Sequence, residues 1–223
     1  MGEMITFAGD GSTTTGYLAT PAPERARGRG VAVIQEWWGL VDHIKKVADR
    51  FAAEGFLALA PDLYHGTATK SPDEAGKLLM ALNIERAEKD LHGAVERLRF
   101  LTGRRVGTVG FCMGGVLSLV AACSHPEGVA ACVVYYGGQP RVNFDFDRLK
   151  APVLGHWAED DDFANASAAS IEAELGRRGL SWEFHSYPGT RHAFFNDERP
   201  EVYDRDAAET SWERTVDFLT RHL

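Results

Sequence analysis

A cysteine stands among closely spaced glycines in the segment Gly110-Phe111-Cys112-Met113-Gly114-Gly115. An apolar, β-rich run precedes this segment and a run with helical spacing follows it, so Cys112 is expected at a sharp strand-to-helix turn. The pattern is that of a nucleophile elbow, with cysteine where serine is more common. Side chains at Gly110 or Gly114 would collide with neighbouring backbone in so tight a turn. Because a helix N-terminus favours an anion, Cys112 is predicted to be a nucleophilic thiolate.

The other two cysteines fit the usual alternative, a buried structural thiol. Cys123 falls in an apolar helical run and Cys132 in an apolar strand. Three cysteines without paired spacing do not indicate a disulfide framework. A reducing cytoplasm is therefore the expected location.

A thiol nucleophile needs a histidine within hydrogen-bonding reach and a carboxylate that orients the histidine. In elbow enzymes the acid and then the histidine follow the nucleophile along the chain, each after a later strand. Among eight histidines, this order selects His192, which follows the turn-rich segment 188–191; the alternative is a solvated loop histidine. Four carboxylates, Glu159 to Asp162, follow an apolar run, and the residues alone do not choose among them. Neighbouring residues of a turn point in different directions, so no metal site is expected there.

The elements that would position these residues alternate in type along the chain. Apolar runs predict buried strands, and the segments between them have helical spacing. The predicted strands are Met4–Phe7, Gly16–Thr20, Val31–Gln35, Phe56–Ala60, Val106–Gly110, Ala130–Tyr136, Val153–Trp157 and Trp182–Tyr187. The predicted helices are Ile44–Glu54, Ile84–Leu101, Gly114–Ser124, Ala166–Gly179 and Glu201–Leu223.

Alternating strands and helices predict an α/β fold, in which helices cover both faces of a mostly parallel central sheet. The first two strands flank Gly9-Asp10-Gly11, a hairpin signal, so the sheet is expected to begin with antiparallel strands. No repeat, low-complexity segment or linker interrupts the 223 residues. A single domain over residues 1–223 is expected.

The charge balance of the chain argues against a nucleic-acid-binding surface. The chain has 24 basic and 32 acidic residues and a formal charge of −8, without a Lys/Arg run. Its apolar stretches are too short to span a bilayer, and its first residues lack the features of a secretory signal. We therefore expect no membrane association.

Over nearly its whole length, the sequence resembles the dienelactone hydrolase family (carboxymethylenebutenolidases) of the α/β-hydrolase superfamily. The motifs that carry the resemblance are Gln35-Glu36-Trp37-Trp38-Gly39, Ala60-Pro61-Asp62-Leu63-Tyr64, the Cys112 elbow, Tyr135-Tyr136-Gly137, and Tyr187-Pro188-Gly189 followed by His192-Ala193-Phe194. The resemblance implies an α/β-hydrolase fold, an enzyme that hydrolyses esters or lactones, and no cofactor or metal.

The resemblance also assigns roles to particular residues. The family's H-x-G-x-x-D-x-F stretch matches the segment from His156 to Phe163, with Ala158 in place of glycine, and this register makes Asp161 the acid and Asp160 the alternative. Glu36, which alone would be interpreted as a strand-end carboxylate facing water, is implied to help Cys112 become a thiolate. The remaining implied residues are Trp37 and Met113, whose backbone N–H groups would hold the oxyanion, and Tyr136, Trp38, Phe194 and Asn196 at the substrate pocket.

Two departures from the family pattern concern the substrate. Family members that act on a carboxylate-bearing lactone have an arginine four residues after the histidine, where this chain has Asn196. A second arginine lies in the helical segment around Ser71–Leu79, where this chain offers Lys70 and Lys77 but no arginine. We therefore expect neutral short esters or lactones as substrates.

Two other functions remain open at this point. A general carboxylesterase or thioesterase of the same fold would share these residues and differ only in its pocket. A thiol-sensing or binding protein on the same scaffold is the alternative from another class, and iodoacetamide labelling with an activity assay separates it from an enzyme. The expected partner is a small-molecule ester or lactone, and the expected state is a monomer or weak homo-oligomer.

Overall fold

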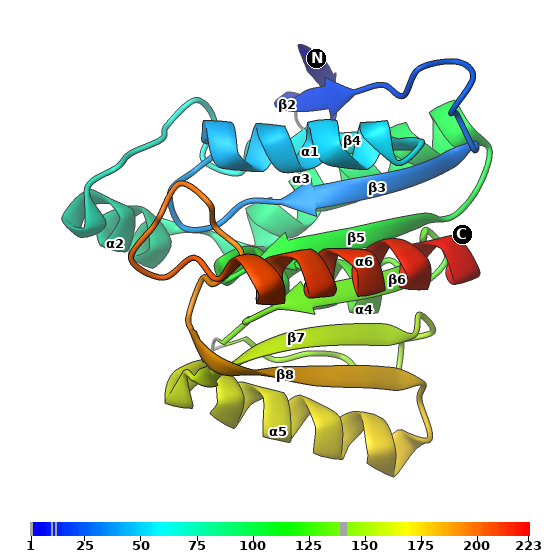
Figure 1. Cartoon of the computed structure of the whole chain (residues 1–223). Coiled ribbons are helices and arrows are strands. Elements are labelled where there is room, and N and C mark those ends of the chain that lie inside the picture. Colours follow the sequence, from blue (N-terminus) through cyan, green and yellow to red (C-terminus); the bar gives the residue numbers. More distant parts are fainter. Residues whose placement is uncertain (1, 10, 12, 139–141) are drawn as a thin grey trace.

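The computed structural model describes residues 2–9, 11, 13–138 and 142–223, and its centre is one continuous β-sheet (Figure 1). The strand order is β1-β2-β4-β3-β5-β6-β7-β8. Strand β2 pairs antiparallel with β1 and with β4, and the remaining pairs are parallel. The strands are β1 (Glu3–Ala8), β2 (Thr13–Ala19), β3 (Arg29–Ile34), β4 (Phe56–Pro61), β5 (Val106–Phe111), β6 (Val129–Tyr135), β7 (Val153–Asp160) and β8 (Trp182–Arg191).

Helices lie on both faces of this sheet. The helices are α1 (Asp42–Ala53), α2 (Pro72–Ala81), α3 (Ile84–Thr102), α4 (Met113–Ser124), α5 (Asp162–Arg178) and α6 (Arg205–His222). In Figure 1, α1 and α6 lie in front of the sheet and α3 and α4 lie behind it. The predicted layers and the antiparallel start of the sheet are confirmed. Of the predicted hairpin signal, Asp10 lies outside the described residues.

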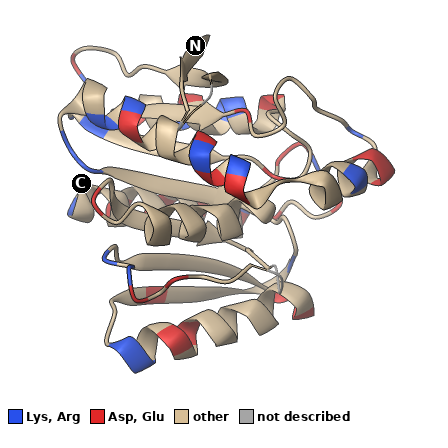
Figure 2. Cartoon of the chain, turned by 180° about the vertical axis from the view of Figure 1, so that it is seen from behind, with Lys and Arg blue, Asp and Glu red and all other residues tan. Residues whose placement is uncertain are grey.

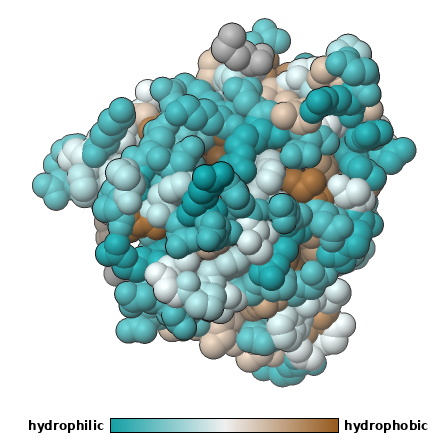
Figure 3. Space-filling view, viewed as in Figure 1, coloured by the Kyte–Doolittle hydropathy of each residue, from teal (hydrophilic) through white to brown (hydrophobic). Residues whose placement is uncertain are grey.

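The central strands are apolar along their whole length because both of their faces are covered. In β3, the side chains of Val31, Ala32, Val33 and Ile34 are fully buried. Most charged groups therefore lie on the outer surface, and the face seen in Figure 3 is mostly hydrophilic with small, separate hydrophobic areas. No described helix combines the length and the apolar character that a membrane crossing requires.

Two strand ends extend further than predicted. Strand β8 continues through Pro188 and Gly189 to Arg191, which pairs with Asp160 at the end of β7. The predicted turn at 188–191 is therefore wrong, because an irregularity in the pairing near Ala158 and a positive φ of 71° at Gly189 let the strands continue. The extension brings the ends of β7 and β8 to the same edge of the sheet.

Two helices begin at residues other than those predicted because aspartates cap them. The Asp161 side chain accepts a hydrogen bond from the Ala164 N–H, so α5 begins at Asp162 instead of Ala166. The Asp204 side chain accepts one from the Ala207 N–H, so α6 begins at Arg205. An aspartate at this position satisfies an N–H group that the helix itself leaves unpaired. For Asp161, the cap also fixes a candidate site residue.

The chain changes direction within the sheet between β3 and β5. It goes outward from β3 to β4 and then returns to β5 on the other side of β3. In open α/β sheets, ligands bind beyond the carboxyl ends of the strands at such a point. Glu36 follows β3 and Cys112 follows β5, so the fold places both candidates at this position.

Candidate active site

Cys112 occupies a strained turn between β5 and α4. Its φ and ψ are 53° and −117°, and its N–H donates to the Tyr135 carbonyl oxygen at 3.0 Å. A Cβ atom on Gly110 would lie 1.8 Å from the Gly114 oxygen, and one on Gly114 would lie 2.3 Å from the Ile34 oxygen. Both distances are far below contact, so the predicted requirement for glycine at these positions holds. The turn leaves the half-buried Cys112 side chain at the N-terminus of α4.

His192 lies just beyond the end of β8 and contacts one member of the acidic segment. Its Nδ1 is 2.5 Å from Oδ2 of Asp161, whose side chain is 7% exposed. Asp160 and Asp162 are exposed, and Glu159 instead accepts a hydrogen bond from the Gly189 N–H at 2.8 Å. Of the four adjacent carboxylates, Asp161 is thus the one that holds the His192 ring.

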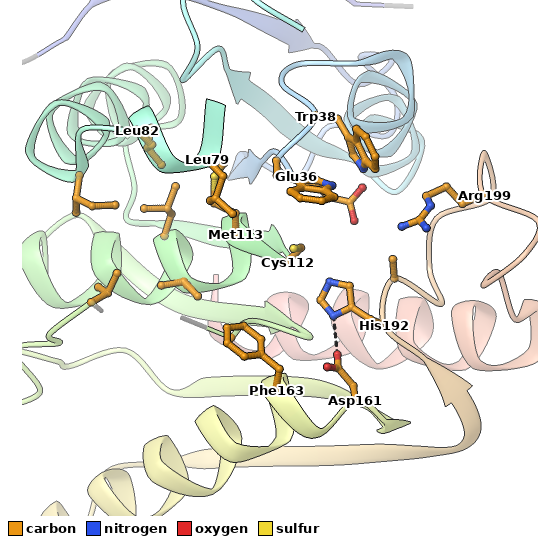
Figure 4. A pocket seen from close by; sticks show the side chains of 17 residues that line it. Glu36, Trp38, Leu79, Leu82, Cys112, Met113, Asp161, Phe163, His192 and Arg199 are labelled. Atoms are coloured by element: carbon orange, nitrogen blue, oxygen red, sulfur yellow. Dashed lines mark hydrogen bonds and ion pairs between the residues drawn. The ribbon is translucent and has the colours of Figure 1, made fainter. Parts of the chain in front are cut away.

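Figure 4 shows His192 between Asp161 and Cys112. Burial lowers the pKa of His192, but its hydrogen bonds with Asp161 and Cys112 outweigh burial and raise the pKa to about 10. Hydrogen bonds and charges that favour the protonated ring raise a histidine pKa in this way. The arrangement therefore favours a protonated His192 at neutral pH, in contact with both a thiol group and a carboxylate.

Glu36 does not face water, which was the alternative interpretation of its position after a strand. Its side chain is 1% exposed, and its Oε2 accepts a hydrogen bond from Nδ2 of Asn196 at 2.8 Å. Asn196 is itself 3% exposed. In Figure 4 the Glu36 carboxylate lies across the pocket from His192. Burial of a carboxylate is unfavourable unless the group is hydrogen-bonded, and Asn196 provides that hydrogen bond.

The two backbone donors expected to hold an oxyanion lie at the same opening. Met113 is the first residue of α4, and the first N–H groups of a helix have no partner within the helix. Trp37 begins the turn that follows Glu36. Both residues line the pocket that also contains Cys112.

This pocket has a volume of about 390 Å³ and a largely apolar wall. Leu79 of α2, Leu82 just after α2 and Ile84 at the start of α3 line one side. Figure 4 shows Leu79 and Leu82 at this side. Among the described residues it is lined by these three and by Glu36, Trp37, Trp38, Cys112, Met113, Val116, Leu117, Gly138, Val142, Asp161, Phe163, His192, Ala193 and Arg199.

Of the four residues expected at the pocket, Trp38 lines it, and the other three are not among the described residues that line it. Tyr136 and Phe194 are fully buried, and the Tyr136 ring packs edge-on against those of His192 and Phe194 at 5.1 and 5.4 Å between centroids. Asn196 holds Glu36, as described above. Through the ring packing and the Glu36 contact, these three residues lie next to residues of the site, and a direct role in binding substrate stays a prediction.

Arg199 lines the pocket and was not predicted from the sequence. Its guanidinium lies 5.8 Å from the Trp38 ring, and its Nε is 2.9 Å from Oε1 of Glu201. Arg199 follows an irregular turn, and no motif spacing marks it. Lys77, a candidate cation from the sequence, pairs with Glu74 at 2.7 Å and is not among the residues lining this pocket.

His156, which begins the motif that contains Asp161, contacts core residues and not the pocket. It is fully buried in β7, its Nδ1 is 2.8 Å from the Tyr187 hydroxyl, and its Nε2 is 3.0 Å from the Thr215 hydroxyl. Burial holds its pKa well below the usual value, so the ring is neutral. It joins β7, β8 and α6 beneath the site.

The two other cysteines are unreactive by environment. Cys123 and Cys132 are buried, and burial raises their pKa values to about 12 and about 11. A thiol with so high a pKa is a poor nucleophile at neutral pH. This agrees with the structural role predicted for both.

The strand order, the turn at Cys112 and the ends of β7 and β8 define the α/β-hydrolase fold. Residues 14–223 match the family model described as "Dienelactone hydrolase family". The chain therefore belongs to the dienelactone hydrolase family, and it is a carboxylic ester hydrolase.

Individual relatives resemble the chain over its full length. "Protein usf" of Aquifex pyrophilus is 36% identical over 233 aligned residues, which cover 100% of both chains. A protein of Aquifex aeolicus named "Putative carboxymethylenebutenolidase" is 34% identical with the same coverage. A crystal structure from Klebsiella pneumoniae, described as "Putative Dienelactone Hydrolase", superposes with a TM-score of 0.84 at 25% identity and covers 98% of this chain and 99% of its own.

Proposed function

We propose that this chain hydrolyses neutral short esters or lactones through a thioester acyl-enzyme formed on Cys112. One observation carries the proposal: His192 contacts both Cys112 and Asp161, and its pKa is raised to about 10. A thiolate next to an imidazolium is the reactive pair of a cysteine hydrolase. In the proposed role, Cys112 is the nucleophile, His192 the proton carrier and Asp161 the group that orients it.

In the acylation step, the Cys112 sulfur attacks the carbonyl carbon and a C–S bond forms. The oxygen that becomes negative accepts hydrogen bonds from the N–H groups of Trp37 and Met113, and each such donor typically contributes about 3 kcal/mol. As the C–O bond to the leaving alcohol breaks, the His192 imidazolium donates its proton to the alcohol oxygen. A neutral thioester and a neutral His192 remain.

In the deacylation step, the uncharged thioester no longer stabilises a proton on His192, and its pKa falls. His192 then takes a proton from water while the water oxygen attacks the thioester carbonyl. The C–S bond breaks, the carboxylic acid leaves, and the thiolate–imidazolium pair is restored. Asp161 keeps Nδ1 of His192 engaged, so the other ring nitrogen faces the reacting atoms.

Glu36 is proposed to assist the cysteine. Its buried carboxylate lines the same pocket as Cys112 and is positioned by Asn196. When Cys112 carries its proton, Glu36 is a second group, in addition to His192, that can accept this proton. It thereby helps to generate the thiolate as substrate binds.

The pocket supports a neutral substrate. Its wall is mostly apolar, and Glu36 and Asp161 already place carboxylates at it. Arg199 is engaged by Glu201 and is partly exposed, so solvent screens it. A substrate carboxylate would lose its hydration without gaining a dedicated partner, which is unfavourable.

The proposal is tested by measuring kcat/KM on p-nitrophenyl acetate and butyrate, neutral lactones, acyl thioesters and dienelactone. We expect turnover of the neutral oxygen esters or lactones, with dienelactone slower than its neutral analogue. Preferred turnover of thioesters would instead identify a thioesterase. Absence of hydrolysis across the panel, together with a peroxide-induced functional change, would favour the thiol-sensing alternative.

A further inference from the structure

We propose that His92, Glu96 and His125 form a binding site for a divalent transition-metal ion, with Zn²⁺ as the principal candidate. One possible ligand atom from each residue lies within 4.8 Å of the other two. The three residues come from α3 and from the position after α4. These two helices lie on the face of the sheet that Figure 2 views. None of them lines the pocket around Cys112.

The backbone arranges two of the ligands on one face of a helix. His92 and Glu96 are four residues apart in α3, and side chains at that spacing are neighbours. Glu88 and Glu85, one and two turns earlier on α3, line the cavity beside His92. The helix therefore presents carboxylates and an imidazole along a single stripe.

His125 is held in place opposite this stripe. Its N–H donates to the Ala121 carbonyl at 2.9 Å, and its own carbonyl accepts from Gly128 and Val129 at 3.0 and 3.1 Å. The rings of His125 and His92 lie 4.0 Å apart between centroids. A ligand with its backbone fixed in this way loses little conformational entropy when an ion binds.

The donor types select the class of ion. Two imidazole nitrogens and one carboxylate oxygen suit Zn²⁺, Co²⁺, Ni²⁺ or Cu²⁺. Mg²⁺ and Ca²⁺ prefer a set made of oxygens. A cavity of about 350 Å³ beside the cluster leaves room for the ion and for a water, or for Glu88, as the fourth ligand.

Binding requires a small, defined rearrangement. Nε2 of His125 is 2.6 Å from Oε1 of Glu96, and a proton holds this pair together. Tetrahedral Zn²⁺ with bonds of about 2.0–2.1 Å would place these atoms about 3.3 Å apart. The ion takes the place of the shared proton, which is released to solvent. Arg99, 2.5 Å from the same oxygen, moves away on its partly exposed side chain.

The site is distinct from the candidate active site. Helix α4 begins next to Cys112 and ends before His125, and its 12 residues span about 18 Å. A bound ion would connect α3 to the end of α4, and it would stabilise the folded chain by an amount that grows with the logarithm of the ion concentration over Kd.

The test is Zn²⁺ titration by calorimetry and Co²⁺ titration by visible absorption, both in a Cys112→Ala background. That background prevents the ion from binding the Cys112 thiolate, so the result does not depend on the proposed hydrolase mechanism. We expect one site, with the absorption of four-coordinate Co²⁺. His92→Ala and His125→Ala should each weaken Zn²⁺ binding by more than about 100-fold. Loss of a residue that only hydrogen-bonds to a metal ligand already weakens metal affinity by about 10–100-fold.

The matched control is His222→Ala, on the surface at the end of α6, which should bind Zn²⁺ like the parent. Glu96→Gln keeps the side-chain shape and should weaken binding without unfolding the helix, as checked by circular dichroism. The proposal is overturned if the parent binds no Zn²⁺ up to about 1 mM, a range in which a three-ligand site would be filled. Equal binding by His92→Ala, His125→Ala and the parent would overturn it as well.

Discussion

The buried carboxylate of Glu36 accepts a hydrogen bond from the side-chain amide of Asn196, with 2.8 Å between Oε2 and Nδ2. Asn196 occupies the position at which the family resemblance implied a substrate-binding arginine. Here the residue donates to Glu36 and is 3% exposed, so its amide positions that carboxylate. An arginine at this position would bury a guanidinium and break the contact with Glu36. Asn196→Arg is therefore a poor test of specificity, and Arg199 is the better one.

Glu36→Gln should lower kcat while the protein stays folded. Glutamine keeps the volume of the side chain but does not accept a proton, and proton-transfer assistance typically contributes about 10²–10⁴-fold. The measurement is steady-state kinetics on a p-nitrophenyl ester, with urea denaturation as the control for stability. Wild-type kinetics in this variant would remove Glu36 from the proposed mechanism.

Asp161→Asn should reduce kcat far more than Asp160→Asn or Asp162→Asn. Asp161 is the carboxylate that contacts His192, whereas its two neighbours are exposed. Asparagine is also a good helix N-cap, so the α5 cap survives and the loss reports on His192. Comparable kinetics for the three variants would contradict the assignment.

Alkylation of Cys112 should lower the pKa of His192. Contact with Cys112 is one of the causes that raise this pKa to about 10, and a neutral carbamidomethyl group removes the thiolate. The measurement is an NMR titration of the His192 ring before and after iodoacetamide treatment. Because Cys123 and Cys132 are buried with raised pKa values, the reagent should modify Cys112 selectively. An unchanged His192 pKa would contradict coupling between the two residues.

The same coupling has a consequence for stability that depends on pH. Folding raises the pKa of His192 above its ordinary value of about 6.5, so its contribution is fully present below about pH 6.5. The contribution is lost as pH rises through the folded value of about 10. Between these limits, the free energy of unfolding should decline less steeply in alkylated protein than in untreated protein.

Neutral esters should be better substrates than anionic ones, and Arg199 should affect only the latter. We expect kcat/KM for p-nitrophenyl butyrate to exceed that for the p-nitrophenyl succinate monoester by about tenfold or more, because the pocket is apolar. Arg199→Gln should reduce activity on the monoester by about two- to fivefold, the scale of a partly exposed ion pair. Activity on butyrate should hardly change.

The same pair of substrates can also contradict the proposed preference for neutral esters. If wild-type protein prefers the monoester and Arg199→Gln abolishes that preference, then Arg199 is a dedicated carboxylate-binding residue. The proposed neutral substrate class would then be wrong, although the proposed nucleophile would be unaffected.

Features set by local geometry could be predicted from the sequence. The turn at Cys112 is one of these, because the clashes that require Gly110 and Gly114 arise within a few residues and at the adjacent strand end. The alternation of apolar runs and helical spacing was enough to predict a mostly parallel sheet with helices on both faces, whereas the strand order came from the structure. The register of the family motif also selected Asp161, and in the structure Oδ2 of Asp161 lies 2.5 Å from Nδ1 of His192.

Features that depend on contacts between distant, irregular segments could not be predicted. Asn196 and Glu36 are 160 residues apart, and no periodicity connects them. Arg199 follows an irregular turn, and its direction depends on Trp38 and Glu201. The burial of Tyr136 behind His192 likewise results from packing in three dimensions.

The most direct measurement of the central claim is intact-protein mass spectrometry during turnover of a p-nitrophenyl ester. The account predicts a transient mass increase equal to one acyl group, which peptide mapping locates on Cys112. Cys112→Ala should show neither the adduct nor esterase activity, whereas Cys123→Ala should retain both. Substantial turnover by Cys112→Ala, or an acyl adduct on another residue, would contradict the account.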